Sequence, residues 1–475
     1  MASMTGHRET ARMGTVRARG SSSTAADGDS GRTGSSPHSL EPDVVASALS
    51  VLQEGRLFRY DCLLPEASPT SCFEREFADF LGTRYAIAVN SCSSALLLAL
   101  LACGVGPGDE VLVPAFTFIA VPSAVVHAGA TPVLVETTAD LVIDPDDLER
   151  KVSPRTKAIL LSYMRGRVPD LERVLEACSR RGVQVVEDVA HGMGVEWDGV
   201  PLGRFGRAAA FSFQSHKLLD GGEGGMVVTD DRDVALRTLL QSGCYDRNWR
   251  LHFLEEGDHD WLEEASNSLP VYGFRMSNLT AAVLRPQLPR VPARLADYRE
   301  RYRRVAEGIA ACPVRLPSHS ERVTPVPDSL QFEIPSLGPE QLRDFVKHCN
   351  ARSVPCRSSG STRLTRAASG TGASSSRWGA PGRPSLAVGR PRVAVVAQRT
   401  RPGPHRRRHP DRAGRRQHAG RLRAPRAPES SARRHGPRGH RDVDRLGMPI
   451  VWMVRCVAPG AVVTRPPLTA LMVQE

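Results

Sequence analysis

A lysine stands between a β-like run and a cluster of glycines in the segment Phe211-Ser-Phe-Gln-Ser-His-Lys-Leu-Leu-Asp-Gly-Gly-Glu-Gly-Gly225. Of the 63 Lys and Arg residues in the chain, four are lysines: Lys151, Lys157, Lys217 and Lys347. Arg stays protonated in proteins and cannot form an imine, whereas a desolvated lysine amine can lose its proton and form one. A lysine before a turn is commonly a plain surface residue. Beside a glycine-rich loop, Lys217 is also a candidate for Schiff-base chemistry on an anionic cofactor.

The composition limits the classes of protein that the chain can belong to. Its 475 residues can hold two or three domains, and a hydrophobic content of 41% can supply a core. No apolar run reaches the ~20 residues that span a bilayer, and the N-terminus lacks the apolar region of a signal peptide. The ten cysteines form no CxxC pair and show no metal-ligand spacing. We therefore expect free thiols, a cytoplasmic location and no metal site.

The net charge of +12 is concentrated in one segment. Residues 351–450 contain 24 Arg, no Lys and four acidic residues, and so carry +20. The rest of the chain therefore carries +12 − 20 = −8. A mildly acidic body argues against nucleic-acid binding by the main part of the protein.

The pattern of residues divides the chain into a tail and a large α/β domain. Residues 1–40 are rich in Ser, Gly, Thr and Arg, which predicts a disordered tail. Residues 41–290 alternate between short apolar runs and helical segments, which predicts a mostly parallel sheet covered on both faces. The predicted strands are 85–90, 110–116, 131–136, 157–163, 183–189, 208–213 and 225–230, and the predicted helices include 93–103, 118–128 and 170–181.

A second domain begins at about residue 291 and breaks off. Residues 291–356 predict a helix at 294–311, a strand at 331–335 and a helix at 339–351. Residues 357–449 contain one aromatic residue, Trp378, and no Ile, and they show no helical or strand period. We expect 357–475 either to be disordered or to come from a shifted reading frame. The shifted frame is favoured because a folded domain stops midway. An Arg-rich nucleic-acid arm is the other alternative, although aromatic residues for base stacking are lacking.

Three further segments lie at the ends of predicted strands, as the segment that carries Lys217 does. In Val89-Asn-Ser-Cys-Ser-Ser-Ala-Leu96 a helix begins with small hydroxyl residues, which is typical of a phosphate site but also of ordinary helix capping. Val185-Val-Glu-Asp-Val-Ala-His-Gly192 ends a strand with two acids and a histidine, where open α/β sheets bind ligands. Pro114-Ala-Phe-Thr-Phe-Ile119 brings aromatic rings that could stack on a flat cofactor or belong to the core. With Ser212 and Lys217, these segments indicate a phosphate-bearing cofactor.

The chain resembles the DegT/DnrJ/EryC1/StrS family of sugar and cyclitol aminotransferases, which use pyridoxal 5′-phosphate. The resemblance implies the PLP-dependent transferase fold of type I, with a mostly parallel central sheet in a large domain and a small α+β C-terminal domain. It covers residues 45–356, beyond which the small domain is truncated. The matching segments are 73–77, 90–96, 104–118, 187–191, 212–217, 222–225 and 274–282.

The resemblance also implies roles for individual residues. Lys217 would be the Schiff-base lysine, Asp188 would pair with the pyridine nitrogen, and Phe118 would stack on the ring. His191 stands where the family often has Gln near the ring hydroxyl. The phosphate would be held by Ser93, Ser94 and Ser212.

The implied activity is transfer of an amino group from glutamate or glutamine to a keto sugar nucleotide or a ketocyclitol in secondary metabolism. Related dehydratases carry His in place of the Schiff-base lysine, so His216 followed by an intact Lys217 favours transamination. The family implies a homodimer with active sites at its interface. Here Gly273 replaces an Asn that reaches the partner's phosphate. The alternatives are a catalytically impaired relic that binds the cofactor, and an enzyme-like body with an Arg-rich nucleic-acid-binding tail.

Overall fold

The computed structural model describes residues 40–358, except 256, 327, 328, 353 and 355, together with the short segments 452–455 and 472–473. The predicted tail at 1–40 lies outside the described residues apart from residue 40, and so does most of the segment 357–475. The division into domains therefore stays a prediction.

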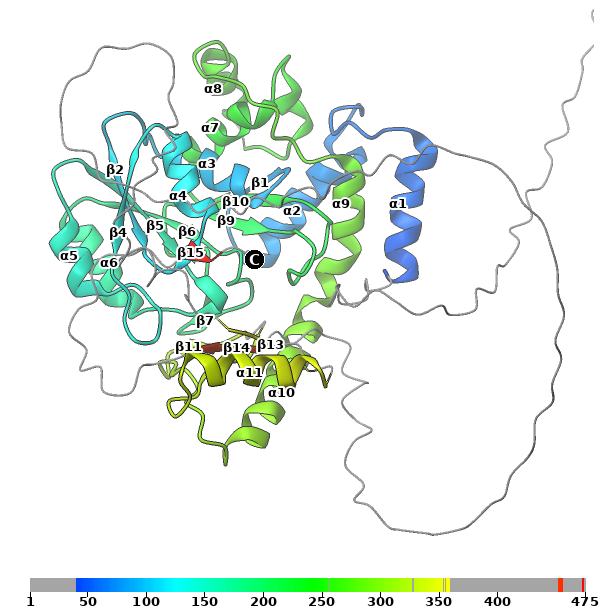
Figure 1. Cartoon of the computed structure of the whole chain (residues 1–475). Coiled ribbons are helices and arrows are strands. Elements are labelled where there is room, and N and C mark those ends of the chain that lie inside the picture. The colour runs from blue at the N-terminus through cyan, green and yellow to red at the C-terminus, as the bar shows by residue number, and fades with distance from the viewer. Residues whose placement is uncertain are drawn as a thin grey trace, which may run out of the picture. The chain divides into compact units, whose positions relative to one another are not determined.

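A seven-stranded sheet forms the centre of the large α/β part (Figure 1). Strand β10 is antiparallel to its neighbours β1 and β9, while the remaining adjacent strands are parallel. The predicted mostly parallel sheet is confirmed, and each predicted strand lies within two residues of its observed bounds. In sheet order the strands are β1 (Tyr85–Val89), β10 (Gly225–Thr229), β9 (Ala208–Ser212), β6 (Gln184–Asp188), β5 (Thr156–Ser162), β2 (Glu110–Pro114) and β4 (Thr131–Val135).

Helices cover both faces of this sheet because its central strands are apolar on both sides. In β5, Ile159 and Leu161 join one hydrophobic cluster while Ala158 and Leu160 join the other, as the period-2 alternation of a strand requires. The helices on the first cluster are α2 (Pro69–Leu81), α5 (Pro145–Lys151), α6 (Leu171–Arg180) and α9 (Asn278–Leu284), and those on the second are α3 (Cys92–Ala102), α4 (Ala120–His127) and α7 (Arg232–Gly243).

One predicted helix begins later than expected. The helix predicted from residue 118 starts at Ala120, and Thr117–Phe118 instead forms the short strand β3, which pairs with β15 (Met472–Val473). Pro122 lies in the first turn of α4, where its missing N–H leaves no helical hydrogen bond unmade. Phe118 is therefore presented by extended backbone rather than by a helix.

The second part of the described chain has its own small sheet and core. Strands β12 (Gln331–Glu333) and β13 (Cys356–Ser358) both pair in parallel with β14 (Trp452–Arg455), which lies between them. The helices α10 (Val291–Ile309) and α11 (Pro339–Asn350) match the two predicted helices. The buried residues of this part are Leu330, Phe332, Ile334, Leu342 and Cys356.

The remaining elements connect these parts. Strand β11 (Val323–Thr324) pairs with β7 (Glu196–Trp197), which pairs with β8 (Val200–Pro201). Helix α1 (Pro42–Glu54) packs on α9 (Figure 1). The other helical segments are η1 (Pro65–Ala67), η2 (Met164–Gly166), η3 (Asn248–Leu251), η4 (Arg285–Arg290) and α8 (Asp258–Ala265).

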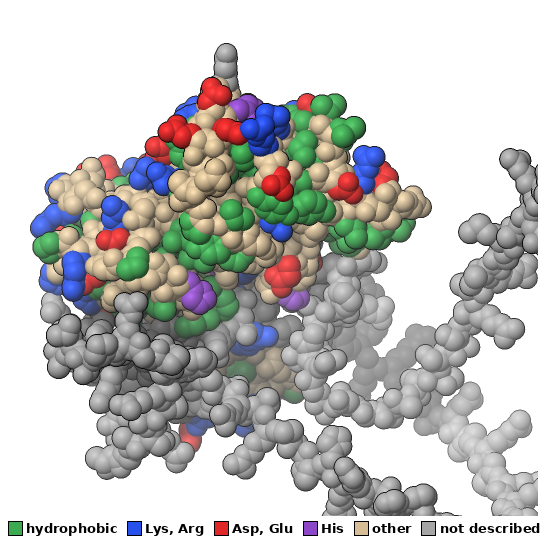
Figure 2. Space-filling view, turned by 90° about the horizontal axis from the view of Figure 1, so that it is seen from above, with side chains coloured by type: hydrophobic (Ala, Val, Ile, Leu, Met, Phe, Trp, Pro, Cys, Tyr) green, Lys and Arg blue, Asp and Glu red, His purple; other side chains and the backbone are tan. Residues whose placement is uncertain are grey.

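None of the helices among the described residues is long and apolar enough to cross a membrane. Within the same residues no group of three or more His, Cys, Asp or Glu side chains could hold a metal ion. On the face shown in Figure 2, Lys and Arg side chains are interspersed with Asp, Glu and hydrophobic side chains.

Candidate active site

Lys217 lies on a tight loop that joins β9 to β10 at the carboxyl end of β9. Two backbone hydrogen bonds close the loop, from Phe213 N to Gly224 O at 2.9 Å and from Ser215 N to Gly222 O at 3.0 Å. His216 has a φ of 78°, a left-handed conformation that costs a non-glycine residue energy and turns the chain just before Lys217. The lysine is thereby presented from a constrained loop and is partly buried.

The amine of Lys217 meets the imidazole of His191. The distance from Lys217 Nζ to His191 Nε2 is 3.0 Å, which is a hydrogen bond. His191 follows β6, and the loop after β5 approaches it closely. A Cβ on Gly166 would lie 3.2 Å from the His191 carbonyl oxygen, so the absence of a side chain allows this approach.

The two acids at the end of β6 have opposite environments. Successive side chains of a strand point to opposite faces, so Glu187 and Asp188 separate. Glu187 accepts hydrogen bonds from the Tyr163 hydroxyl at 2.8 Å and from the backbone N–H groups of Gly203, Phe205 and Gly206 at 3.0, 2.8 and 2.7 Å. Burial raises the pKa of the Glu187 carboxyl. Glu187 therefore fixes the loop before β9.

Asp188 ends β6 at the carboxyl edge of the sheet, and the loop that carries Lys217 leaves the neighbouring parallel strand β9 at the same edge. Its carboxylate accepts a hydrogen bond from Ser162 Oγ at 2.7 Å and one from Ala190 N at 3.2 Å. The thiol of Cys92 is close enough to respond to both site residues. Burial raises its pKa well above the usual range, the negative charge of Asp188 raises it further, and the positive charge of Lys217 opposes this. Asp188 and Lys217 therefore both act electrostatically on Cys92, which lies in the first turn of α3.

The start of α3 has the geometry of an anion site. Ser91 caps the helix by accepting a hydrogen bond from Ser94 N at 3.1 Å, and the first-turn N–H groups of Cys92 and Ser93 have no acceptor within the helix. The helix dipole adds positive potential here. Ser93 is exposed, whereas Ser94 is buried and donates to Asn90 Oδ1 at 2.7 Å. Ser93 is therefore open to a ligand, while Ser94 also holds the turn together.

Gly225 allows this helix start to lie against the sheet. A Cβ at Gly225 would be 2.5 Å from the carbonyl carbon and oxygen of Ser91 and 2.7 Å from Cys92 N. Gly225 is paired with Ser212 on β9 and with Val89 on β1. Ser212 therefore lies two strands from the end of β1, at the same edge of the sheet as the start of α3.

The other predicted residues are less closely tied to this cluster. Ser212 is buried, and its hydroxyl accepts a hydrogen bond from Gln214 N at 3.4 Å. Phe118 is half-buried on β3, beyond the carboxyl end of β2. Both lie at the carboxyl edge of the sheet. Among the described residues, Phe118 makes no hydrogen bond or ring contact with Lys217 or Asp188.

Some residues at this edge were missed by the sequence analysis. Ser162 ends β5 and donates a hydrogen bond to Asp188. The charges of Asp188 and Lys217 have opposite effects on the pKa of the Cys92 thiol. Ser162 could have been found as a hydroxyl residue at the end of a predicted parallel strand, the position that identified Asp188. The contacts of Gln287 and Arg294 with the lysine loop had no sequence signal, because they bridge 67 and 76 residues.

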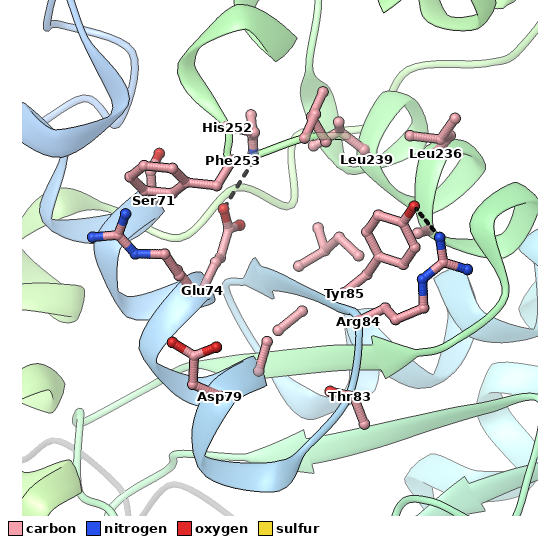
Figure 3. Close-up of a pocket in the computed structure, with 16 residues that line it drawn as sticks. Ser71, Glu74, Asp79, Thr83, Arg84, Tyr85, Leu236, Leu239, His252 and Phe253 are labelled. Atoms are coloured by element: carbon pink, nitrogen blue, oxygen red, sulfur yellow. Dashed lines mark hydrogen bonds and ion pairs between the residues drawn. The ribbon is translucent and has the colours of Figure 1, made fainter. Parts of the chain in front are cut away.

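A cavity of about 100 Å³ lies elsewhere, between α2, β1 and α7 (Figure 3). None of the predicted site residues lines it. Figure 3 shows Glu74 and His252 pointing toward each other beside this cavity, and His252 Nδ1 lies 2.9 Å from the Glu74 carboxylate. The predicted site at the sheet edge and this cavity are therefore separate features.

The fold and this edge define a transferase of the PLP-dependent fold type I class: a mostly parallel sheet, a lysine after β9, an acid at the end of β6 and an open helix start after β1. The model of the DegT/DnrJ/EryC1/StrS aminotransferase family matches residues 64–358, and the chain belongs to this family. The predictions of the family, of its fold and of pyridoxal 5′-phosphate as its cofactor are confirmed.

Several relatives show what the chain is similar to. A GDP-perosamine synthase from Caulobacter vibrioides is 41% identical over 228 residues, which cover 47% of this chain and 57% of that protein. An L-glutamine:scyllo-inosose aminotransferase from Streptomyces griseus is 43% identical over 166 residues, covering 35% of this chain and 39% of that protein. The crystal structure of 3-amino-5-hydroxybenzoic acid synthase matches with a TM-score of 0.59 and 30% identity, over 67% of this chain and 80% of that chain. The chain spans about half the length of the curated relatives it matches.

The residues at the sheet edge fit this cofactor. The amine of Lys217, 3.0 Å from an imidazole, suits the aldehyde of the cofactor. The carboxylate of Asp188 suits its ring nitrogen. The start of α3, where first-turn N–H groups have no acceptor within the helix, suits its phosphate.

Proposed function

We propose that this protein is an aminotransferase that moves an amino group from glutamate or glutamine to a keto sugar nucleotide or a ketocyclitol. The observation that carries the proposal is the 3.0 Å contact of Lys217 Nζ with His191 Nε2, at the carboxyl edge of the sheet where Asp188 ends β6. Bound pyridoxal phosphate supplies an aldehyde that can accept an amino group and a ring that can delocalise electrons from the neighbouring carbon.

Lys217 is the group that moves the proton in this proposal. As a free amine it can take a proton from the α-carbon of the amino donor and return one to the acceptor carbon. When Lys217 is an ammonium, neutral His191 can accept its hydrogen bond and keep Nζ in place.

Asp188 would hold a positively charged ring nitrogen. Its carboxylate already accepts two hydrogen bonds, from Ser162 and from the backbone of Ala190, which fix its orientation. A fixed carboxylate keeps the ring nitrogen protonated and so makes the ring a better electron acceptor. Ser162 is a supporting residue in this proposal.

The remaining roles follow from position. Ser93 and Ser94 at the start of α3, together with Ser212, would hold the phosphate, and Phe118 would cover one face of the ring. Relatives named for GDP-perosamine and for scyllo-inosose support an acceptor that is a keto sugar nucleotide or a ketocyclitol. Free cysteines among the described residues support the proposed cytoplasmic location.

We also propose that the protein acts as a homodimer. Helix α1 and the segment after it expose apolar side chains, among them Leu49, Leu52 and Leu63 at 48, 51 and 93%. An exposed apolar strip of this kind is typical of a protein–protein interface. A Leu52→Glu variant is expected to sediment as a monomer, while the control Val200→Glu, at another exposed apolar residue, stays dimeric. Monomeric wild-type protein would contradict the proposal.

The activity is tested with the full chain loaded with pyridoxal phosphate. Addition of L-glutamine or L-glutamate without an acceptor should remove the visible absorbance of the lysine-bound cofactor and release one equivalent of keto acid per site. Subsequent addition of a ketocyclitol or a keto sugar nucleotide should restore the absorbance. A protein that keeps its cofactor absorbance with both donors would be a cofactor-binding relic, and the proposed transfer would be wrong.

A further inference from the structure

The loop that carries Lys217 is fixed from outside by two side chains of the connection between the large and small parts. Gln287, in η4, is buried at 1% exposure. Its Nε2 donates to the Asp220 carbonyl at 2.7 Å, and its Oε1 accepts from Asp220 N at 3.2 Å. One amide side chain thus pairs with both backbone groups of a residue three positions after Lys217.

Arg294, in the first turn of α10, holds the same loop at a second point. Its Nη1 donates to the Leu218 carbonyl at 3.1 Å and to Gln287 Oε1 at 3.1 Å. Its Nη2 forms an ion pair of 3.0 Å with Glu41, directly before α1. The carbonyl next to Lys217 therefore takes its position from a guanidinium that is itself held at two other points.

The loop also has an internal brace. Asp220 Oδ1 accepts hydrogen bonds from Ser215 Oγ at 3.0 Å and from Gly222 N at 2.9 Å, so the two sides of the loop move together. A shift of Asp220 or Leu218 must therefore be passed on to Lys217. Because His191 is held by β6 on the other side, such a shift changes the distance between the amine and the imidazole.

We propose that Gln287 and Arg294 are positioning residues for Lys217: they set where Nζ lies relative to His191 and Asp188 without touching the reactants. This inference rests on the proposed cofactor chemistry of Lys217. Misplacement of a reacting group by about 1 Å can cost about 100-fold in rate. The two side chains should therefore affect bond formation at Lys217 more than they affect the stability of the fold.

The chain offers matched controls for both residues. Arg290 lies in η4 and, like Arg294, makes an ion pair with the α1 region, to Asp43 at 2.6 Å, but its described contacts do not include the lysine loop. Gln241 is a buried glutamine in α7 at 5% exposure, away from the loop. Arg290→Ala is therefore the control for Arg294→Ala, because both remove an ion pair. Gln241→Leu is the control for Gln287→Leu, because both remove a buried amide.

The experiment measures how fast pyridoxal phosphate forms its borohydride-reducible bond with Lys217 in the full chain. Gln287→Leu and Arg294→Ala are expected to slow bond formation about 10- to 100-fold. They should also increase hydrogen exchange in the peptide that contains residues 214–222. Arg294→Lys, which keeps one donor for the Leu218 carbonyl, should recover part of the rate. Arg290→Ala and Gln241→Leu should bond at the wild-type rate, whatever they do to the unfolding midpoint.

The outcomes separate the two levels of inference. The positioning role is wrong if Gln287→Leu and Arg294→Ala form the reducible bond at the wild-type rate, or are slowed no more than Gln241→Leu and Arg290→Ala. The proposed function would still stand. If the wild-type chain itself forms no reducible bond, the proposed function fails and the positioning role fails with it.

Discussion

Two clusters of ionisable side chains in this molecule have similar members and different surroundings. Beside α2, Arg59 is fully buried and donates to both carboxylate oxygens of Glu74 at 2.9 and 2.8 Å. His252 Nδ1 lies 2.9 Å from Glu74, and the Tyr60 hydroxyl lies 3.0 Å from His252 Nε2. At the sheet edge, Lys217 and His191 are also paired, but Lys217 is only partly buried and the helix start beside them is open.

The difference shows how a structural cluster differs from a reactive one. The Arg59 cluster adjoins the cavity of Figure 3, yet the guanidinium of Arg59 and the carboxylate of Glu74 are paired with each other. Removing one partner would leave the other charge buried without compensation. The Lys217 edge has a smaller network but presents an amine, a carboxylate and free N–H groups together.

The largest expected effect is at the reactive cluster. Lys217→Ala should lower the turnover of the amino transfer by at least about 1,000-fold, because the amine that moves the proton is lost. Its unfolding free energy should stay close to the wild-type value, since Lys217 is not part of the core. Steady-state kinetics and chemical unfolding measure the two effects. The control Lys347→Ala, at an exposed lysine paired with Asp344, should change neither. Full activity in Lys217→Ala would erase the distinction between the clusters.

The structural cluster should show the reverse. Arg59→Met leaves Glu74 buried without its cation and should lower the unfolding free energy by about 3–5 kcal/mol. Arg84→Met breaks an exposed pair with Glu255 beside the same cavity and should lower the unfolding free energy far less, because solvent screens the pair. Urea unfolding compares the two variants. At temperatures where both are folded, the cofactor affinity should match the wild type, and a large loss of affinity in Arg59→Met would place this cluster in the active site.

The pH dependence of stability should report the same cluster. Glu74 is held ionised against the cost of burial by Arg59 and His252, which lower its pKa from 4.5 to about 2. A lowered folded-state pKa means that this stabilisation is present above the unfolded pKa and is lost as the pH falls toward 2. The loss should approach about 3 kcal/mol between pH 4.5 and 2.

A variant isolates this contribution from other acidic groups. In Glu74→Gln, unfolding free energies measured over the same pH range should show a smaller decline than in the wild type. Burial and the charge of Arg59 lower the pKa of His252, while Glu74 raises it, so protonation of His252 below its ordinary pKa of 6.5 adds a loss of stability that itself depends on Glu74. The two proteins are therefore compared with His252 replaced by Gln in both. Identical acid profiles for the two proteins would contradict the assignment of the effect to Glu74.

A smaller effect is expected where α3 meets the sheet. In Gly225→Ala the added Cβ would contact Ser91 and Cys92 at 2.5–2.7 Å, so the helix start must move. Overpacking of this kind typically costs about 1–3 kcal/mol. We expect a lower unfolding free energy and a weaker affinity for pyridoxal phosphate, measured by fluorescence titration. Gly106→Ala, where a Cβ would have no neighbour within 4 Å, should leave the affinity unchanged, and an unchanged affinity in both would argue against a phosphate site at α3.

The sequence predicted the sheet well because its strands are short apolar runs at regular intervals. It also predicted that Lys217, Asp188 and Ser93 follow strand ends, since parallel strands bring their carboxyl ends to one edge. It could not predict that Glu187 accepts a hydrogen bond from the loop at Gly203. The alternation of side chains in a strand indicated only that Glu187 and Asp188 face opposite sides.

Long-range partners were beyond the sequence pattern. Gln287 reaches Asp220 across 67 residues, and neither residue belongs to a motif that indicates the contact. Strand β14 lies between β12 and β13 although about 90 residues without a periodic pattern separate it from β13. The start of α4 was misplaced by two residues because β3 is too short to show a strand period.

The central claim is that Lys217 is the residue that binds pyridoxal phosphate covalently. The direct test is to incubate the full chain with the cofactor, reduce with borohydride, digest, and locate the label by mass spectrometry. The account predicts one phosphopyridoxyl group per chain, on Lys217, and none on Lys151, Lys157 or Lys347. A label on another lysine, or a wild-type chain that carries no label, would contradict it.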